Sequence, residues 1–169
     1  MGIKQDAWET IYKDLLPRVF NYFRYRLDDG YVAEELTSVT FEKAWKARRR
    51  YEKDKSAFST WVFSIARNTA IDYLRRQGKE IELDVKNVDV NSVSIEEIYE
   101  KQEEAHHLSK VLSILDNREK ELIGLKYGAD LTNRKIADIT GLTETNVGTI
   151  LHRTINKLRE EWEEQKDES

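Results

Sequence analysis

Cysteine is absent from the 169-residue sequence, proline occurs once, at Pro17, and there are only three histidines. The lack of cysteine excludes disulfide bonds and thiolate metal sites, and three imidazoles are too few for a convincing metal cluster. Apolar runs stop at three or four residues, and the N-terminus, with Asp6 and Glu9, lacks the basic and apolar segments of a targeting signal. We therefore expect a soluble cytoplasmic chain that needs no metal or cofactor.

The composition is polar but compatible with a folded protein. Charged residues make up 36% of the chain and hydrophobic residues 39%, with four Trp and eight Tyr, which is too apolar for general disorder. This balance predicts small cores and a large wetted surface. The sequence shows no carboxylate–histidine pair, glycine-rich phosphate loop or metal-ligand spacing, which argues against an enzyme and against a small-molecule substrate.

Charge is divided unevenly along the chain, although the net charge is only −4. Residues 1–79 carry 16 Lys and Arg against 11 Asp and Glu, and residues 80–121 carry 5 against 12. The corresponding numbers are 6 against 4 for residues 122–160 and 1 against 5 for residues 161–169. Because attraction to phosphate is local and screened within about 10 Å, two basic blocks separated by an acidic one favour a two-site DNA binder. Ordinary solvated helix faces are the alternative interpretation.

Helical periodicity in nearly every segment predicts an all-α fold made of two small helical domains. The exception begins after Gly78, where residues 81–93 alternate apolar with polar, largely acidic, side chains. We interpret residues 80–93 as a flexible acidic linker, with a short strand as the alternative. The linker divides the chain into an N-terminal domain, residues 1–79, and a C-terminal domain, residues 94–169.

The C-terminal domain is predicted to contain four helices, the last two forming a helix-turn-helix over residues 131–159. Asp116 or Asn117, Leu131-Thr132 and Thr143 mark the expected starts of its last three helices. The final helix has one apolar stripe and an outward polar face, which fits the major groove of DNA. The candidate DNA-reading residues are Thr143, Thr145, Asn146, Thr149, His152 and Arg153. A plain helical hairpin with a solvated polar side is the alternative.

The N-terminal domain carries two further patterns. Residues 48–76 interleave basic and aromatic side chains, a mixture that suits single-stranded DNA because bases stack on rings while cations follow the phosphates. The alternative is that the aromatic rings belong to the hydrophobic core, and we accept this interpretation for most of them. Tyr51 and Asn68 are the better candidates for contact with DNA. Upstream, Glu35, Ser38 and Glu42 share one polar helix face, which would suit a basic partner.

The order and spacing of three segments resemble the sigma-70 family of bacterial transcription initiation factors. Residues 33–45 look like its helix that binds core RNA polymerase. Residues 58–76 follow its −10-reading pattern F-x-x-W-x-x-x-I-A-R-N-x-A-I-D-x-x-R-R, and residues 131–159 are similar to its −35-reading helix-turn-helix. The chain length leaves room for these parts alone, which indicates the extracytoplasmic-function group.

The resemblance implies sites and partners. It implies contacts with the clamp coiled coil and flap of core RNA polymerase, with the polymerase-binding residues Glu34, Glu35, Ser38 and Glu42. It also implies recognition of melted −10 promoter DNA by Arg49, Tyr51, Ser64, Arg67, Asn68, Arg75 and Arg76. The −35 element would meet the candidate residues of the last helix. An anti-sigma factor, free or membrane-anchored, and a role in regulated transcription such as a stress response are implied as well.

The sequence departs from the family pattern at two positions, and two alternative functions remain compatible with it. Many relatives carry Glu at the position of Lys135 and Lys at that of Gly148, so we expect details of −35 readout to differ. A stand-alone helix-turn-helix regulator would explain residues 131–159 but not the basic and aromatic block. A decoy that mimics a sigma factor and binds an anti-sigma protein without DNA would not need the polar face of the last helix.

Overall fold

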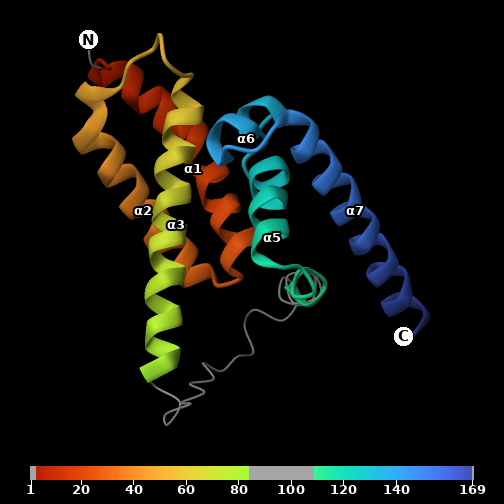
Figure 1. The fold of residues 1–169 in the computed structure, drawn as a ribbon. Helices are drawn as coiled ribbons and strands as arrows, with labels where there is room; N and C mark the ends of the chain where they lie inside the picture. Colours follow the sequence, from red (N-terminus) through yellow and green to blue (C-terminus); the bar gives the residue numbers. More distant parts are fainter. Residues whose placement is uncertain (1–2, 84–108, 169) are drawn as a thin grey trace.

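The computed structural model of the chain describes residues 3–83 and 109–168, and the regular secondary structure in these ranges is helical throughout. Figure 1 shows α1, α2 and α3 on one side and α5, α6 and α7 on the other. The bounds are α1 (Gln5–Leu27), α2 (Gly30–Ala47), α3 (Phe58–Leu83), α5 (Asn117–Ile123), α6 (Asn133–Thr140) and α7 (Glu144–Asp167). A short 3-10 turn, Arg48–Arg50, follows α2, and a π-helical turn, Gly124–Gly128, follows α5. The predicted all-α fold is confirmed.

Helix α3 extends past residue 79, after which the predicted linker begins. Helix α3 continues to Leu83, four residues into the segment interpreted as linker. A glycine in a helix interior costs about 1 kcal/mol but does not end the helix when good helix formers follow, as Lys79 and Glu80 do here. The remainder of the predicted linker, residues 84–93, and most of the first predicted C-terminal helix lie outside the described residues.

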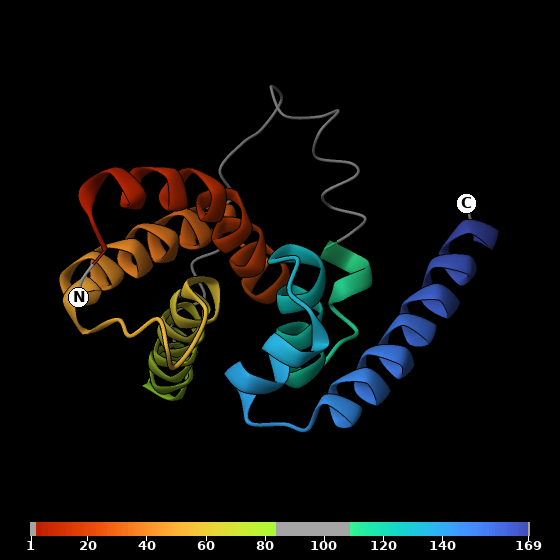
Figure 2. The same ribbon diagram turned by 90° about the horizontal axis from the view of Figure 1, so that it is seen from above.

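Helix α1 is the central element of the N-terminal half. Its buried residues recur every three or four positions and therefore form one stripe: Leu15, Val19, Tyr22, Phe23 and Arg26. Pro17 lies inside the helix and has no N–H for the preceding turn, and Figure 2 shows α1 changing direction along its length. Helix α2 packs against both α1 and α3, so the three helices form a compact layer around this stripe.

The starts predicted for the last three helices are confirmed, and each uses a local cap. Asp116 accepts a hydrogen bond from the Glu119 N–H, and the Glu119 side chain accepts one from the Asp116 N–H, which completes a capping box. The side chains of Thr132 and Thr143 accept hydrogen bonds from backbone N–H groups three residues later. These bonds satisfy N–H groups that have no partner inside the helix. Because each bond joins residues only three positions apart, the residue at which each helix begins can be predicted from the local sequence.

The two halves share one hydrophobic core instead of forming two separate ones. The cluster of buried side chains runs from Leu15 and Phe63 in the first half to Leu122, Ile136 and Leu151 in the second. Helix α1 packs against α5 and the π-helical turn, while α3 packs against α6. The second half therefore lies against α1 and against α3, the helix that carries most of the basic and aromatic block.

Candidate nucleic-acid interface

Helix α7 presents the candidate polar face to solvent. Val147, Leu151 and Thr154 are buried against the rest of the C-terminal half. All six candidate −35 side chains are exposed: Thr143, Thr145, Asn146, Thr149, His152 and Arg153. Figure 2 shows α7 extending away from the other helices, so its outer side is open along its length. This is the arrangement that entry into a major groove requires.

Some of these polar groups are already engaged locally. The Thr143 hydroxyl accepts a hydrogen bond from the Asn146 N–H at 3.1 Å and so caps the helix. The Thr149 hydroxyl donates to the Thr145 carbonyl oxygen at 3.0 Å, so its proton is already engaged within the helix. Gly148 lies beside this face, and a β-carbon there would come no closer than 3.7 Å to the Asn133 side chain. A β-carbon at position 148 would therefore be accommodated.

The candidate −10 residues are less uniform. Arg49, Asn68, Arg75 and Arg76 are exposed, whereas Ser64 and Arg67 are half-buried. Ser64 donates to the Thr60 carbonyl oxygen at 2.9 Å, and Arg75 pairs with Asp72 one turn earlier. Asn68, Arg75 and Arg76 lie on α3, where the two arginines give the helix a basic surface, whereas Arg49 lies on the 3-10 turn that follows α2.

Tyr51 is covered in this structure. Its side chain is only 8% exposed, its hydroxyl donates to the Ser56 carbonyl oxygen at 2.9 Å, and burial raises the pKa of its phenol. Its ring centroid lies 5.1 Å from that of Phe58 and 5.3 Å from that of Trp61. The Tyr51 ring thus packs against the start of α3 and anchors the loop before it, which is the arrangement expected if the aromatic rings of this block belong to the core. Stacking on a −10 base stays a prediction and requires the ring to be uncovered.

Arg67 joins a buried ion-pair network that the sequence did not reveal. Its Nε donates to Glu121 Oε1 at 3.0 Å, and the other carboxylate oxygen of Glu121 accepts from Arg26 Nη1. Arg26 also donates to the Tyr22 hydroxyl at 3.0 Å. Arg26 lies three residues after Phe23 on the apolar stripe of α1. A charged residue at a position that continues an apolar stripe is the sequence signal that could have identified Arg26 as a buried member of this network.

Burial controls the ionisation of this network. Burial raises the pKa of the Tyr22 phenol to about 12, although the neighbouring Arg26 opposes the shift. For Arg26, burial alone would lower the pKa, but the attraction of Tyr22 and Glu121 outweighs it and raises the pKa above its ordinary value. Arg26 therefore stays charged, and its positive charge needs Glu121 as a buried counterion.

The candidate polymerase-binding residues form one exposed acidic face on α2. Glu34, Glu35, Ser38 and Glu42 are all exposed. Lys46 donates to Glu42 at 2.8 Å, and this hydrogen bond lowers the pKa of the Glu42 carboxyl. Residues 35, 38 and 42 follow one another at helical spacing, so a single partner surface can contact them together.

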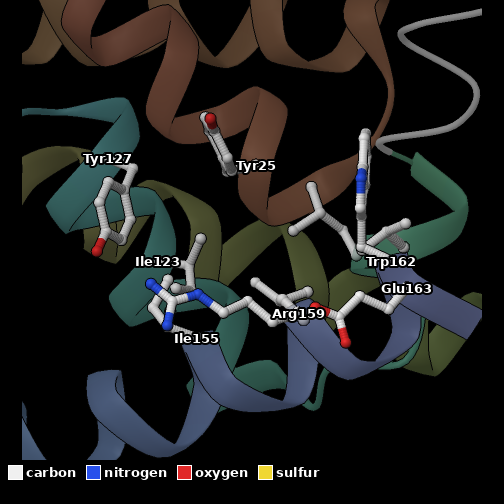
Figure 3. A pocket seen from close by; sticks show the side chains of 10 residues that line it. Tyr25, Ile123, Tyr127, Ile155, Arg159, Trp162 and Glu163 are labelled. Atoms are coloured by element: carbon white, nitrogen blue, oxygen red, sulfur yellow. The ribbon is translucent and has the colours of Figure 1, made fainter.

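An apolar groove of about 420 Å³ lies where the two halves meet (Figure 3). Tyr25 of α1 lines one wall, and Ile123, Ile155 and Trp162 of the second half line the others. Trp162 is 40% exposed, and Arg159 and Glu163 also line the groove. Tyr25 is the one lining residue from the first half, so the groove belongs mainly to the second half.

Comparisons with known proteins agree with this arrangement. The profile for Sigma-70 region 2 matches residues 11–80, and that for Sigma-70, region 4 matches residues 111–160. RNA polymerase sigma factor SigV of Bacillus subtilis is 30% identical over 139 residues, covering 80% of this chain and 81% of the relative. The chain belongs to the sigma-70 family. ECF RNA polymerase sigma factor RpoE of Cereibacter sphaeroides is 24% identical and covers 91% of this chain and 85% of the relative.

Solved structures support the fold of this sigma factor. The sigma factor RpoE, solved in complex with the anti-sigma factor NepR from Bartonella quintana, aligns with a TM-score of 0.74 at 24% identity, covering 90% of this chain and 94% of that one. CnrH, solved in complex with the cytosolic domain of CnrY, aligns with a TM-score of 0.63 at 20% identity, covering 95% of this chain and 90% of that one. In both comparisons the likeness extends over nearly the whole chain.

The sigma factor is an alternative, extracytoplasmic-function member of the family and not an enzyme. The region 2 match covers most of α1, all of α2 and most of α3, and the region 4 match covers α5, α6 and most of α7. Across the parts of the chain that the structure describes, none of the helices combines the length and the apolar character needed to cross a bilayer.

Proposed function

We propose that this sigma factor directs core RNA polymerase to its promoters through three surfaces of the described structure. The acidic face of α2 binds the clamp coiled coil of the polymerase, the basic surface of α3 binds the melted −10 element, and α7 reads the −35 element. The observation that supports this proposal most directly is the exposed polar face of α7, which lies on the opposite side of the helix from its buried residues. Hydroxyl, amide and guanidinium groups on one helix side can read base edges and hold phosphates at once.

In-vitro transcription tests this function. Purified sigma factor and core polymerase are combined on a genomic DNA library, and the transcripts are mapped to their start sites. We expect new start sites that share sequence elements near −35 and −10 and that are absent with core polymerase alone. Specific binding of duplex DNA without polymerase, together with no new transcripts, would instead favour a stand-alone regulator.

The partner that controls this activity is proposed to be an anti-sigma factor, free or anchored in a membrane. Its contact surface would include the apolar groove, because a helix with apolar side chains can bury Trp162 and Tyr127, which are 40% and 53% exposed. The sigma factor itself is proposed to act in the cytoplasm, where polymerase and chromosome are found. Trp162→Ala should weaken capture of a candidate anti-sigma protein without changing transcription.

A further inference from the structure

Tyr31 is the most exposed of the large hydrophobic residues that the structure describes. It is 80% exposed, compared with 53% for Tyr127 and 40% for Trp162. It lies in the first turn of α2, one residue after the helix begins at Gly30. A ring exposed to this degree adds little to the core, and single exposed rings are common on protein surfaces. Its position on the helix therefore decides whether it has a further role.

Tyr31 extends the acidic face of α2 by one turn. Glu35, Ser38 and Glu42 follow it at intervals of four, seven and eleven residues. At about 100° per residue, these four side chains lie within about 60° of one another around the helix. Thr40 follows Tyr31 by nine residues, which places it on the opposite side, and it is fully buried. The ring therefore belongs to the same outward surface as the three polar residues.

The start of α2 is held by Asp29. Its carboxylate accepts hydrogen bonds from the Tyr31 N–H at 2.9 Å and from the Val32 N–H at 3.2 Å. These bonds satisfy N–H groups that have no partner inside the helix, so the first turn is ordered through the backbone and not through the Tyr31 ring. Figure 1 shows α2 on the far side of the N-terminal half from α5, α6 and α7. The backbone position of the ring is therefore fixed, while the ring stays open to a partner.

An aromatic ring beside a carboxylate suits one cationic side chain. Tyr31 and Glu35 are four residues apart, which places their β-carbons about 6 Å apart on one side of the helix. Among the described residues Glu35 has no ion-pair partner, whereas Glu42 pairs with Lys46. A guanidinium or ammonium group can lie over the ring while the carboxylate pairs with its charge. The phosphates of a nucleic acid would be repelled by this acidic face.

We propose that Tyr31 and Glu35 together hold one cationic side chain of the polymerase clamp coiled coil, the ring binding the face of the cation and the carboxylate its charge. Arginine fits this arrangement better than lysine, because its planar group stacks on a ring and pairs with a carboxylate at the same time. The proposal rests on the proposed function in placing the acidic face of α2 against core polymerase. It adds an aromatic contact that the acidic residues do not provide.

The ring sets the size of the expected effect. A cation over an aromatic ring is worth a factor of about 2 to 30 in a binding constant, and the larger value applies when the pair is desolvated. Tyr31→Ala should therefore raise the Kd for core polymerase by about 5- to 30-fold. Tyr31→Phe keeps the ring face and should stay within about twofold of the wild type. Tyr31→Leu keeps apolar area without a ring, so it should lose most of the affinity that Tyr31→Ala loses.

The experiment measures the Kd of the full-length sigma factor for core polymerase by fluorescence anisotropy. Since the chain has no cysteine, fluorescein is attached at Asp167→Cys, an exposed position beyond the region 4 match. Tyr12→Ala is the matched control, because the Tyr12 ring packs at 4.8 Å on Phe41 of α2 and so lies beside the same helix but outside its acidic face. The control should stay within about twofold of the wild-type Kd. Circular dichroism checks that each variant is folded.

A double-mutant cycle tests whether the ring and the carboxylate share one cation. Combined with Glu35→Gln, Tyr31→Ala should raise the Kd by less than the product of the two single effects, because the shared contact is lost only once. Combined with Glu42→Gln, the two effects should multiply, because Tyr31 and Glu42 are about 16 Å apart along the helix axis.

Three results would overturn the proposal. The first is a wild-type Kd for both Tyr31→Ala and Tyr31→Leu in folded protein. The second is a Tyr31→Phe variant as weak as Tyr31→Ala, because the hydroxyl and not the ring face would then make the contact. The third is a cycle in which the effects of Tyr31→Ala and Glu35→Gln multiply.

Failure of the proposed function gives a different pattern. In that case the wild-type protein does not bind core polymerase, or reversing Glu35 and Glu42 to Lys leaves its Kd unchanged, and the proposal for Tyr31 fails with it. If the wild-type protein binds and the double reversal abolishes binding, an unchanged Kd for Tyr31→Ala counts against Tyr31 alone.

Discussion

At the scale of single residues, burial decides whether a polar side chain is available to a ligand. Asn68 and Tyr51 were predicted together as readers of the −10 element, yet Asn68 is exposed and Tyr51 is 8% exposed. Burial likewise distinguishes Tyr22, which lies in the core, from the tyrosines that are exposed to solvent. A side chain held in the core contributes to stability, and its ionisation is linked to unfolding.

Tyr22 should make the protein sensitive to alkali. Its pKa is raised from 10.0 to about 12, so between pH 10 and 12 the unfolded chain loses the phenolic proton while the folded protein keeps it. The contribution is therefore complete below pH 10 and is lost as pH rises towards 12, with a limit of about 2–3 kcal/mol. Denaturant unfolding measured at several pH values should show this decrease. Tyr22→Phe should flatten it, whereas Tyr31→Phe, at an 80% exposed tyrosine, should leave it intact.

Asn68 and Tyr51 should respond differently to substitution. Asn68→Ala should change the free energy of unfolding by less than about 0.5 kcal/mol, because the side chain is exposed, but should reduce transcription. Tyr51→Ala should cost about 3–5 kcal/mol, as for other buried aromatic side chains, and so loosen the loop. A template already mismatched at −10 separates their roles. It should restore Tyr51→Ala activity if the ring assists DNA opening, but not Asn68→Ala activity if that side chain reads a base.

At the scale of the helix, spacing places functional groups on one side. Helix α2 shows this with Glu35 and Glu42, two turns apart and both exposed. Reversing both to Lys should abolish association with core polymerase while the fold survives, because a basic partner would then meet positive charge. Glu9→Lys with Glu164→Lys makes the same change in net charge at exposed positions elsewhere. Co-purification of the α2 variant with core polymerase at the wild-type level would refute the assignment.

Helix α7 allows base reading to be separated from phosphate binding. Arg153→Ala should weaken transcription at all promoter variants if the guanidinium holds phosphate, and at one position by about 1–3 kcal/mol if it reads a guanine. Thr149→Ala should have a smaller, position-dependent effect. The measurement is transcription across a panel of −35 variants. Unchanged transcription from every promoter with both substitutions would show that α7 does not lie in the groove.

At the scale of the molecule, the shared core should make the two halves unfold together. Hydrogen exchange measured by mass spectrometry should give similar opening free energies for α3 and α7 in the wild-type protein. Gly128→Ala should separate the two values, because a β-carbon at position 128 would lie 2.9 Å from main-chain atoms of Asn21 and Tyr22 in α1 and so force the halves apart. Two distinct opening energies in the wild-type protein would indicate that the packed arrangement is not its main state in solution.

Sequence alone determined the local features of this sigma factor. The helix starts at Asp116, Thr132 and Thr143 could be predicted because a cap is a hydrogen bond to a backbone group three residues away. The polar face of α7 could be predicted because helical spacing fixes which side chains share a side. The family could be recognised because three such local patterns occur in one order.

Only the tertiary structure decided how the halves combine. The pairing of Glu121 with Arg26 and Arg67 joins residues 95 and 54 positions apart, a separation at which the sequence gives no periodic signal. The need for glycine at position 128 depends on the approach of α1, and the burial of Tyr51 depends on Phe58 and Trp61 closing over it. Local patterns fix the direction of a side chain relative to its own helix, whereas its neighbours across the core depend on how the helices pack.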